Sequence, residues 1–269
     1  MAAALAARRD QLGVLAGLAS LEQPVVASRF RLPVLIVFDP AVARQVLVTD
    51  ASSYSRPWPV TRIMREGLGD NLFTADEEAW VERRRVVAPV FARSHGDELA
   101  RLMALTITDE ITRWQAGRAE DIQSDLTDLT LRVATRALLG KDTAEDELGR
   151  AIRDQFEVVL QWISHRFSHI GAPPSVVPTR RNRAMKEARC ELEAIVRRII
   201  AERRRSGIAT VDVLGRLLES QVDPGVGPTD EAIVEECIGL LFAGPAASPP
   251  LPRRVTTVSK RLRTTSYSA

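Results

Sequence analysis

Residues 72–91 read Leu-Phe-Thr-Ala-Asp-Glu-Glu-Ala-Trp-Val-Glu-Arg-Arg-Arg-Val-Val-Ala-Pro-Val-Phe. Thr74 is followed three residues later by Glu77, which is the capping-box pattern and predicts that a helix starts here. Four residues then share one face of this helix at helical spacing: Trp80, Arg84, Val87 and Phe91. The sequence therefore predicts one arginine in the middle of a large apolar stripe.

An arginine at such a position needs an anion, because an isolated buried charge is costly. The planar guanidinium group of Arg84 suits a carboxylate, which it binds with two hydrogen bonds. The carboxylate could come from a glutamate of the same protein. Alternatively Arg84, with the indole N–H of Trp80 beside it, binds a carboxylate of a cofactor. The neighbouring Arg83 and Arg85 are expected to point elsewhere and to remain in solvent.

The pattern Trp-x-x-x-Arg followed by Pro-x-Phe is formed here by Trp80, Arg84, Pro89 and Phe91. Together with the preceding Leu-Phe-Thr-Ala-Asp, it resembles the C-helix region of the cytochrome P450 family. In these haem-thiolate monooxygenases the tryptophan and arginine of this motif bind a haem propionate. The resemblance therefore implies that Trp80 and Arg84 bind haem.

The segments before this motif support the resemblance by their order. We expect a helix within residues 5–22, then a β-hairpin formed by Val25–Phe30 and Val34–Phe38. Asp39-Pro40 then opens a short helix, and Ser55-Arg56-Pro57 follows, as in family members. Residues 56–71, rich in proline and glycine, are predicted to be a loop. In the family the corresponding loop roofs the substrate pocket, whereas the simpler interpretation is a loop folded back on the core.

The remainder of the chain is predicted to be helical, with breaks at glycine and proline. The expected helices cover residues 98–116, 122–139, 145–164, 180–205 and 210–220, and a further one begins after Thr229. The two helices on either side of Gly171–Pro178 resemble the mobile lid formed by the family's F and G helices. The arginines of the 180–205 helix alternate with glutamates, which is typical of a solvated face.

The last predicted helix ends in Leu241-Phe242-Ala243-Gly244, which resembles the first half of the oxygen-binding motif of the family's I helix. This implies that Ala243 and Gly244 lie at the distal face of the haem. The resemblance ends there, since Ala246 and Ala247 stand where the family has an acid and an alcohol. Prolines 245, 249 and 250 would break or kink a continuing helix.

Two further family motifs, Glu-x-x-Arg and the cysteine loop that ligates iron, do not follow. We therefore expect residues 1–244 to form a partial cytochrome P450-like domain and residues 245–269 to be an aberrant, disordered tail. The abrupt change in composition at Gly244–Pro245 resembles a change of reading frame.

Composition excludes several classes of protein. Residues 251–269 hold five basic residues and no acidic one, so 32 of the 37 basic residues remain against 35 acidic ones elsewhere, a net charge of −3. The body of the chain therefore has no electrostatic footprint for nucleic-acid binding. No apolar run approaches the roughly 18 residues of a membrane span. The start of the chain lacks the features of a signal peptide, so we expect a cytoplasmic protein.

The two cysteines and the histidines give no alternative site. Cys190 and Cys237 form no disulfide framework and are expected to be small buried hydrophobic residues. His165 and His169 are four residues apart, but zinc would need a third ligand that the pattern does not supply. His95 is expected at the surface.

The sequence thus predicts a mainly α protein, the N-terminal part of the cytochrome P450 fold with a small β-hairpin near its start. The resemblance implies haem, an apolar substrate and a redox partner. It provides cofactor-binding residues (Trp80, Arg84, Ala243 and Gly244) but no catalytic residue and no metal ligand. We expect no monooxygenase activity from this chain alone, because the axial thiolate of this class is missing. The alternative is a helical interaction fragment that needs a complementary C-terminal half.

Overall fold

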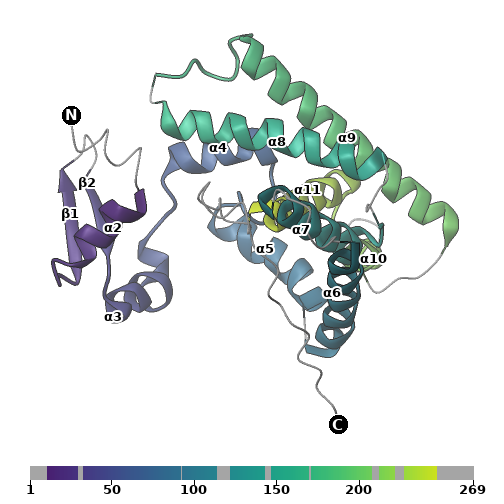
Figure 1. Ribbon diagram of the computed structural model, residues 1–269, viewed down its shortest axis with the longest axis horizontal. Helices are drawn as coiled ribbons and strands as arrows, with labels where there is room; N and C mark the ends of the chain where they lie inside the picture. Colours follow the sequence, from purple (N-terminus) through teal and green to yellow (C-terminus); the bar gives the residue numbers. More distant parts are fainter. Residues whose placement is uncertain are drawn as a thin grey trace. The chain divides into compact units, whose positions relative to one another are not determined.

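The computed structural model gives a mainly helical protein with a two-stranded antiparallel hairpin near its start, as the sequence predicts (Figure 1). It falls into two compact units, Met1–Arg56 and Pro57–Ala269, which are described separately. The structure describes the following residues: 11–29, 33–91, 93–113, 122–142, 147–169, 171–207, 212–221 and 227–246.

The first unit is built around the predicted hairpin. Val25 pairs with Val37 and Val26 with Ile36. Its elements are α2 (Gln11–Ala19), β1 (Val25–Arg29), β2 (Pro33–Val37), α3 (Pro40–Arg44), a π-helical turn (Gln45–Thr49) and a 3₁₀ turn (Ala51–Ser53). Asp39 caps α3, because its Oδ1 accepts hydrogen bonds from the N–H groups of Ala41 and Val42 at 2.8 and 3.0 Å. The predicted helix at residues 5–22 is present from Gln11, and residues 1–10 lie outside the described part.

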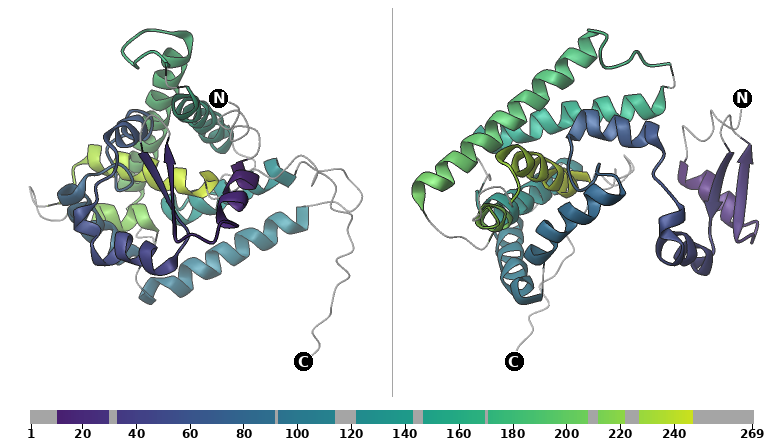
Figure 2. Two further views of the ribbon diagram at one scale, coloured as in Figure 1. Left: turned by 90° about the vertical axis from the view of Figure 1, so that its left-hand side faces the viewer. Right: turned by 180° about the vertical axis from the view of Figure 1, so that it is seen from behind.

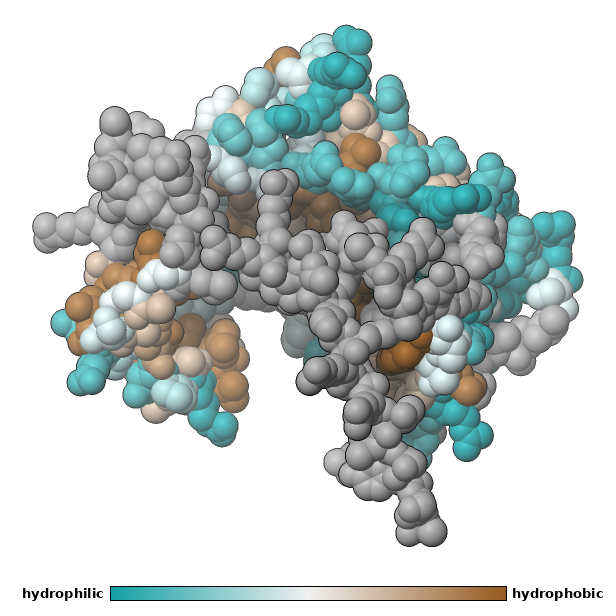
Figure 3. All heavy atoms as spheres, in the orientation of Figure 1, coloured by the Kyte–Doolittle hydropathy of each residue, from teal (hydrophilic) through white to brown (hydrophobic). Residues whose placement is uncertain are grey.

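The second unit is a bundle in which α8 and α9 form a long helical hairpin over the other helices (Figure 2). Its elements are α4 (Trp58–Leu68), α5 (Glu77–Val87), a 3₁₀ turn (Ala88–Phe91), α6 (Arg93–Arg113), α7 (Ile122–Leu139), α8 (Glu147–Ser168), α9 (Arg180–Ser206), α10 (Val213–Glu219) and α11 (Asp230–Ala246). Helix α11 contacts α7, α9, α4 and α10, and therefore lies inside the unit. Figure 3 shows hydrophilic residues over most of the outer surface of α8 and α9.

The core of this unit is apolar and continuous. Its largest fully buried side chains come from six helices, α4, α7, α8, α9, α10 and α11. They are Leu68, Leu139, Ile152, Phe156, Trp162, Leu192, Ile199, Leu214, Leu217, Ile233, Ile238 and Leu241. The indole N–H of Trp162 donates to Asn182 Oδ1 at 2.8 Å, so the one polar atom of this ring is satisfied inside the core.

Helix α4 corrects the prediction of a loop over residues 56–71. Pro57 is the N-cap residue and Pro59 lies in the first turn, where a missing N–H costs nothing. The prolines that suggested a loop therefore start a helix. Its far end is packed tightly, since a Cβ added at Gly67 would lie 2.8 Å from the side chain of Ile163 in α8.

Several predicted helix boundaries are confirmed. Gly140 and Gly207 follow α7 and α9 with φ of 63° and 62°, the left-handed conformation that favours glycine. Thr229 caps α11, because its Oγ1 accepts a hydrogen bond from the Ala232 N–H at 3.2 Å. Helix α11 passes through Pro245 and ends at Ala246, two residues beyond the expected boundary at Gly244. The predicted tail from residue 247 onward lies outside the described residues.

Among the described helices, none is both long and apolar enough to cross a lipid bilayer.

Candidate functional site

The turn before α5 is held by Thr74, but this residue does not cap the helix as the capping-box pattern predicts. The N-cap is Asp76, and it makes no side-chain capping bond. The buried Thr74 hydroxyl donates to the Gly69 carbonyl at 2.6 Å and accepts from the Asn71 N–H at 3.0 Å. Thr74 therefore closes the turn over residues 69–75, and this role competes with capping.

Trp80 and Arg84 lie together on α5, as their spacing predicts. The guanidinium carbon of Arg84 is 5.1 Å from the centroid of the Trp80 ring, which is a cation–π contact. Trp80 is half-buried and Arg84 is exposed. Among the described residues, no carboxylate forms an ion pair with Arg84. The exposed guanidinium group is therefore held by the indole and remains open to an external anion.

The predicted apolar stripe of α5 is only partly correct. Val87 is buried, but Phe91 and Arg84 are exposed. Arg84 is thus not the arginine that the fold buries. The helix is turned so that its neighbour faces the interior.

That neighbour is Arg83, which corrects the prediction that it remains in solvent. Its Nη1 lies 2.7 Å from Glu236 Oε1 in α11, and its Nη2 lies 2.9 Å from Asp70 Oδ2. The side chain of Arg83 is 20% exposed and that of Glu236 only 6%, so this ion pair is well shielded from water. Arg85 is exposed, as predicted.

Glu236 also holds the turn that precedes α5. Its Oε2 accepts a hydrogen bond from the Leu72 N–H at 3.0 Å. One helical turn further along α11, Gly239 leaves room for the buried Asn71, because a Cβ at this glycine would lie 2.5 Å from Asn71 Cγ. Helix α11 therefore holds the turn by the hydrogen bond to Glu236 and by the space that Gly239 leaves for Asn71. It holds α5 by the ion pair between Glu236 and Arg83.

The adjacent Glu235 faces a different helix. It forms an ion pair with Arg189 of α9, which also lies 3.0 Å from Glu193 and donates to the Gly67 carbonyl at 3.4 Å. Burial raises the pKa of Glu235, while Arg189 opposes that rise. The two consecutive glutamates thus join α11 to α9 on one side and to α5 on the other.

Ala243 and Gly244, the two remaining predicted site residues, belong to the last turns of α11. Their backbone is helical, which agrees with the expected continuation of this helix. Their side-chain surroundings lie outside the described part of the chain.

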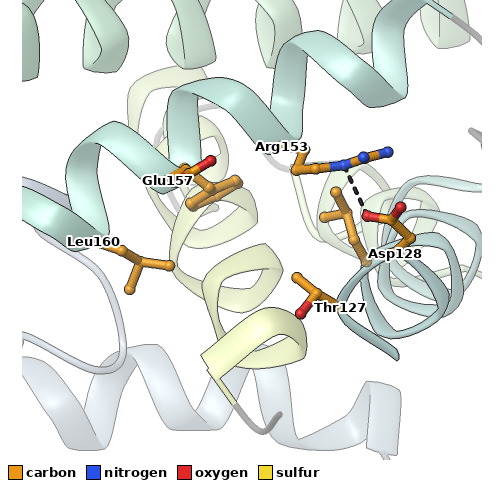
Figure 4. Close-up of a pocket in the computed structure, with 7 residues that line it drawn as sticks. Thr127, Asp128, Arg153, Glu157 and Leu160 are labelled. Carbon is orange, nitrogen blue, oxygen red and sulfur yellow. Dashed lines mark ion pairs between the residues drawn. The ribbon is translucent and has the colours of Figure 1, made fainter. Parts of the chain in front are cut away.

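A separate pocket of ≈ 230 Å³ lies between α7 and α8 (Figure 4). It is lined mainly by apolar atoms of Thr127, Asp128, Leu131, Arg153, Phe156, Glu157 and Leu160. At one end Arg153 Nε lies 2.9 Å from Asp128 Oδ1. Burial raises the pKa of Asp128 despite the nearby Arg153. None of the sequence-predicted site residues lines this pocket.

The cysteines differ from each other, and the prediction that both are buried is wrong for one. Cys237 is buried in α11, and burial raises the pKa of its thiol to about 12. Cys190 is exposed on α9. The rings of His165 and His169 stack with centroids 4.1 Å apart, and the described residues contain no group of three potential metal ligands. The side chain of His95 lies outside the described part.

A sequence model of the cytochrome P450 family matches residues 27–248. The chain belongs to the cytochrome P450 family. The match begins just inside the hairpin and includes α5 and the whole of α11, so it covers all four predicted cofactor-binding residues.

Curated relatives agree with this assignment. Cyclooctatin synthase of Streptomyces melanosporofaciens is 28% identical over 79% of this chain and 46% of the relative. Cyclooctat-9-en-7-ol 5-monooxygenase of the same organism is 30% identical over 67% of this chain and 39% of the relative. Secologanin synthase 1 of Catharanthus roseus is 26% identical over 80% of this chain and 44% of the relative. The chain therefore spans less than half the length of these relatives.

The fold is also found among solved structures. The structure described as retinoic acid-bound cyanobacterial CYP120A1 superposes with a TM-score of 0.62 at 21% identity. The matched part covers 82% of this chain and 49% of that chain. This P450 neighbour supports the fold expected from the sequence.

The ion pair between Arg83 and Glu236 is the part of the site that sequence reasoning missed. A signal was present, because α11 is apolar around most of its circumference and Glu236 falls among these residues. An acid in such a position predicts a basic partner on a neighbouring helix. The pattern does not identify which of three consecutive arginines on α5 is that partner.

Proposed function

We propose that this chain forms the distal, propionate-binding part of a haem monooxygenase that oxidises apolar small molecules. The observation that carries the proposal is the Trp80–Arg84 pair on a helix matched by the family. Its guanidinium group is exposed, held over an indole, and without a carboxylate partner among the described residues. The names of the Streptomyces relatives, a synthase and a monooxygenase, support the same reaction class.

The residues of α5 fit one edge of a haem. Arg84 offers a planar set of donors that suits a propionate, and stacking on Trp80 limits the orientations that the guanidinium group adopts. Ala243 and Gly244 are small residues that would allow close approach of the ring to α11. When bound, haem would supply the iron at which dioxygen is activated.

The cysteines present do not fit the axial position of that iron. The Cys237 thiol is enclosed in the apolar core, and burial raises its pKa to about 12, which disfavours the thiolate form. Cys190 lies on the exposed side of α9. We therefore propose that residues outside this chain supply the thiolate, and that the chain alone has no monooxygenase activity.

The next part of the proposal concerns the substrate and the remaining predictions. The pocket between α7 and α8 is apolar, but its ≈ 230 Å³ is below the ~300 Å³ at which sites for drug-sized ligands usually begin. A substrate would therefore need additional surface. We further propose an external redox partner and a cytoplasmic location. We also propose a partial domain at residues 1–244, followed by an aberrant, disordered tail at 245–269.

The test is a titration of the purified chain with ferric haem, followed by absorbance. Arg84→Gln should weaken binding about tenfold, the typical effect of losing a charge-assisted hydrogen bond. The matched control is Arg85→Gln, which removes an exposed arginine from the same helix and should leave the affinity unchanged.

Two results would contradict the proposal. Equal affinities for haem in the wild type and Arg84→Gln would contradict the proposal that Arg84 binds a propionate. A red-shifted, thiolate-type Soret band of the reduced carbon monoxide complex would show that Cys190 or Cys237 binds iron, which the burial of one and the position of the other argue against.

A second function, an interaction fragment that needs a complementary chain, is favoured by the surface of α6. Three large apolar residues of this helix, Met103, Ile107 and Ile111, share one face at i, i+4 spacing and are 37%, 38% and 52% exposed. Exposed apolar patches of this kind mark protein interfaces. Co-purification with the C-terminal half of cyclooctatin synthase would support this function, and the absence of any association at micromolar concentration would oppose it.

A further inference from the structure

We propose that Glu236 is a positioning residue for the anion site on α5: by binding Arg83, it sets the rotation of this helix and so presents Trp80 and Arg84 to a carboxylate. The inference rests on the proposed function, because that carboxylate would be a haem propionate. It assigns a role in this site to a residue of α11 that does not itself contact the ligand.

The geometry of an α-helix couples the two arginines. Consecutive residues are separated by about 100° around the helix axis. Once Arg83 points at α11, Arg84 points about 100° to one side of it. Trp80 lies one turn back on the same side as Arg84. A change in the rotation of α5 would therefore move both residues of the anion site together.

The contacts of Glu236 are suited to fixing that rotation. Both of its carboxylate oxygens are used, one by the Arg83 guanidinium group and the other by the Leu72 N–H. The second partner of Arg83, Asp70, is 57% exposed and therefore provides a weaker restraint. In the described part of the chain, the ion pairs from α5 to other elements all run through Arg83.

The electrostatics separate the two arginines by role. Glu236 neutralises Arg83 within the protein, so this arginine does not compete with Arg84 for an external anion. The carboxylate of Glu236 pairs with the shielded Arg83, whereas the exposed Arg84 has no such pair among the described residues and can attract an external anion. Glu236 thus removes Arg83 from the arginines of α5 that are available to an external anion.

The experiment compares two ligands of the full chain, ferric haem and its dimethyl ester, which lacks the propionate charges. The wild type should prefer haem to the ester, and Arg84→Gln should abolish that preference. Glu236→Gln keeps an acceptor for the Leu72 N–H but removes the charge. It should lower the affinity for haem about tenfold and leave the affinity for the ester unchanged.

The matched control is Glu235→Gln, which breaks a half-buried ion pair from the adjacent position of α11 to α9. It should leave the ratio of the two affinities at the wild-type value. Arg83→Gln removes the same ion pair at its more exposed partner. It should show the loss of affinity expected for Glu236→Gln, and it replaces Glu236→Gln as the test if Glu236→Gln does not fold. Hydrogen exchange should be faster at residues 77–87 in both variants of the pair and unchanged there in the control.

The outcomes separate the two proposals. If the wild type shows no preference for haem, or Arg84→Gln keeps it, the proposed function fails, and the positioning role that rests on it fails as well. If both hold but Glu236→Gln and Arg83→Gln retain the preference, only the positioning role is overturned. Equal weakening for haem and ester would also overturn it, because a merely structural residue would affect both ligands alike.

Discussion

Helices α9 and α6 are both long and amphipathic, but only α9 has its apolar side covered. Seven apolar residues of α9 are at most 5% exposed: Met185, Ala188, Leu192, Ile195, Val196, Ile199 and Ile200. On α6, Met103, Ile107 and Ile111 share one face at i, i+4 spacing and are 37%, 38% and 52% exposed. The difference does not arise from composition, since both helices carry an apolar stripe. It depends on how many neighbours each helix has.

Among the described elements, α9 packs on α8, α11 and α4, whereas α6 packs mainly on α7 and on the short turn before it. The end of α9 is also held by charge, because Arg203 pairs with Asp212 at 2.8 Å and Arg204 binds both carboxylate oxygens of Asp230. The side of the bundle around α9 is therefore complete, while the side around α6 presents surface that a further element could cover. The predictions below test this contrast.

The largest effect is expected in the core beneath α9. Leu192→Ala removes a fully buried side chain and should lower the free energy of unfolding by about 3 kcal/mol. Ile107→Ala on α6 should cost less than about 1 kcal/mol, because its side chain is already partly hydrated. Urea denaturation of both variants measures the difference, and equal costs would show that α6 is covered in solution.

A smaller loss is expected where α9 is anchored at its end. Asp212→Ala removes the partner of Arg203 and the cap of α10, whose Gly215 N–H donates to Asp212 Oδ1 at 2.8 Å. We expect a loss of about 2 kcal/mol, because a cap and a shielded charge pair disappear together. Glu219→Ala, which removes an exposed pair from α10, is the control and should change stability by less than about 0.5 kcal/mol. Similar losses in both variants would mean that the shielding of the pair has no effect.

The second anchor of α9 predicts a pH dependence. Hydrogen bonds from Arg204 lower the pKa of Asp230 from 3.8 to about 2 in the folded chain. Its stabilisation is therefore complete above the unfolded pKa near 4 and is lost as the pH falls through about 2. Because the Asp230 side chain is 46% exposed, solvent screening limits the contribution to about 1 kcal/mol or less.

Thermal unfolding between pH 5 and pH 2 tests this dependence. Asp230→Asn should remove part of the acid sensitivity over that interval, while Glu231→Gln, one residue further along α11, should retain it. An unchanged pH profile in Asp230→Asn would contradict the assignment.

The smallest effect on stability is expected on the open side. Ile107→Glu should change the free energy of unfolding by less than about 0.5 kcal/mol, because the position is partly exposed. It should nevertheless reduce association with the C-terminal half of cyclooctatin synthase, measured by sedimentation velocity over a range of concentrations. If association is unchanged, the apolar surface of α6 is not the contact.

The order of the elements was predictable from the sequence because it depends on periodicity and on local signals. Gly140, Gly207 and Thr229 end or start helices where expected, for reasons confined to a few neighbouring residues. The failure at α4 has the same local character, since prolines in a first turn and prolines in a loop give similar patterns.

The site was less predictable because it depends on the rotation of α5. Spacing correctly brings Trp80 and Arg84 together, but it does not specify which side of the helix faces inward. Glu236, which lies 153 positions from Arg83 in the sequence, binds it and so turns it inward. The prediction that both cysteines are buried failed for Cys190 for a similar reason, since a position on a long amphipathic helix does not define the edge of its buried face.

The contacts of α11 with the turn before α5 have a consequence for engineering by recombination. Leu72 and Glu236 are bonded across 164 positions, and Asn71 fits only against a residue without a Cβ at position 239. A chimera with a single crossover between these two segments takes the turn from one parent and the contacting residues of α11 from the other. Parents should therefore be chosen to agree at both segments, or two crossovers should transfer them as one block.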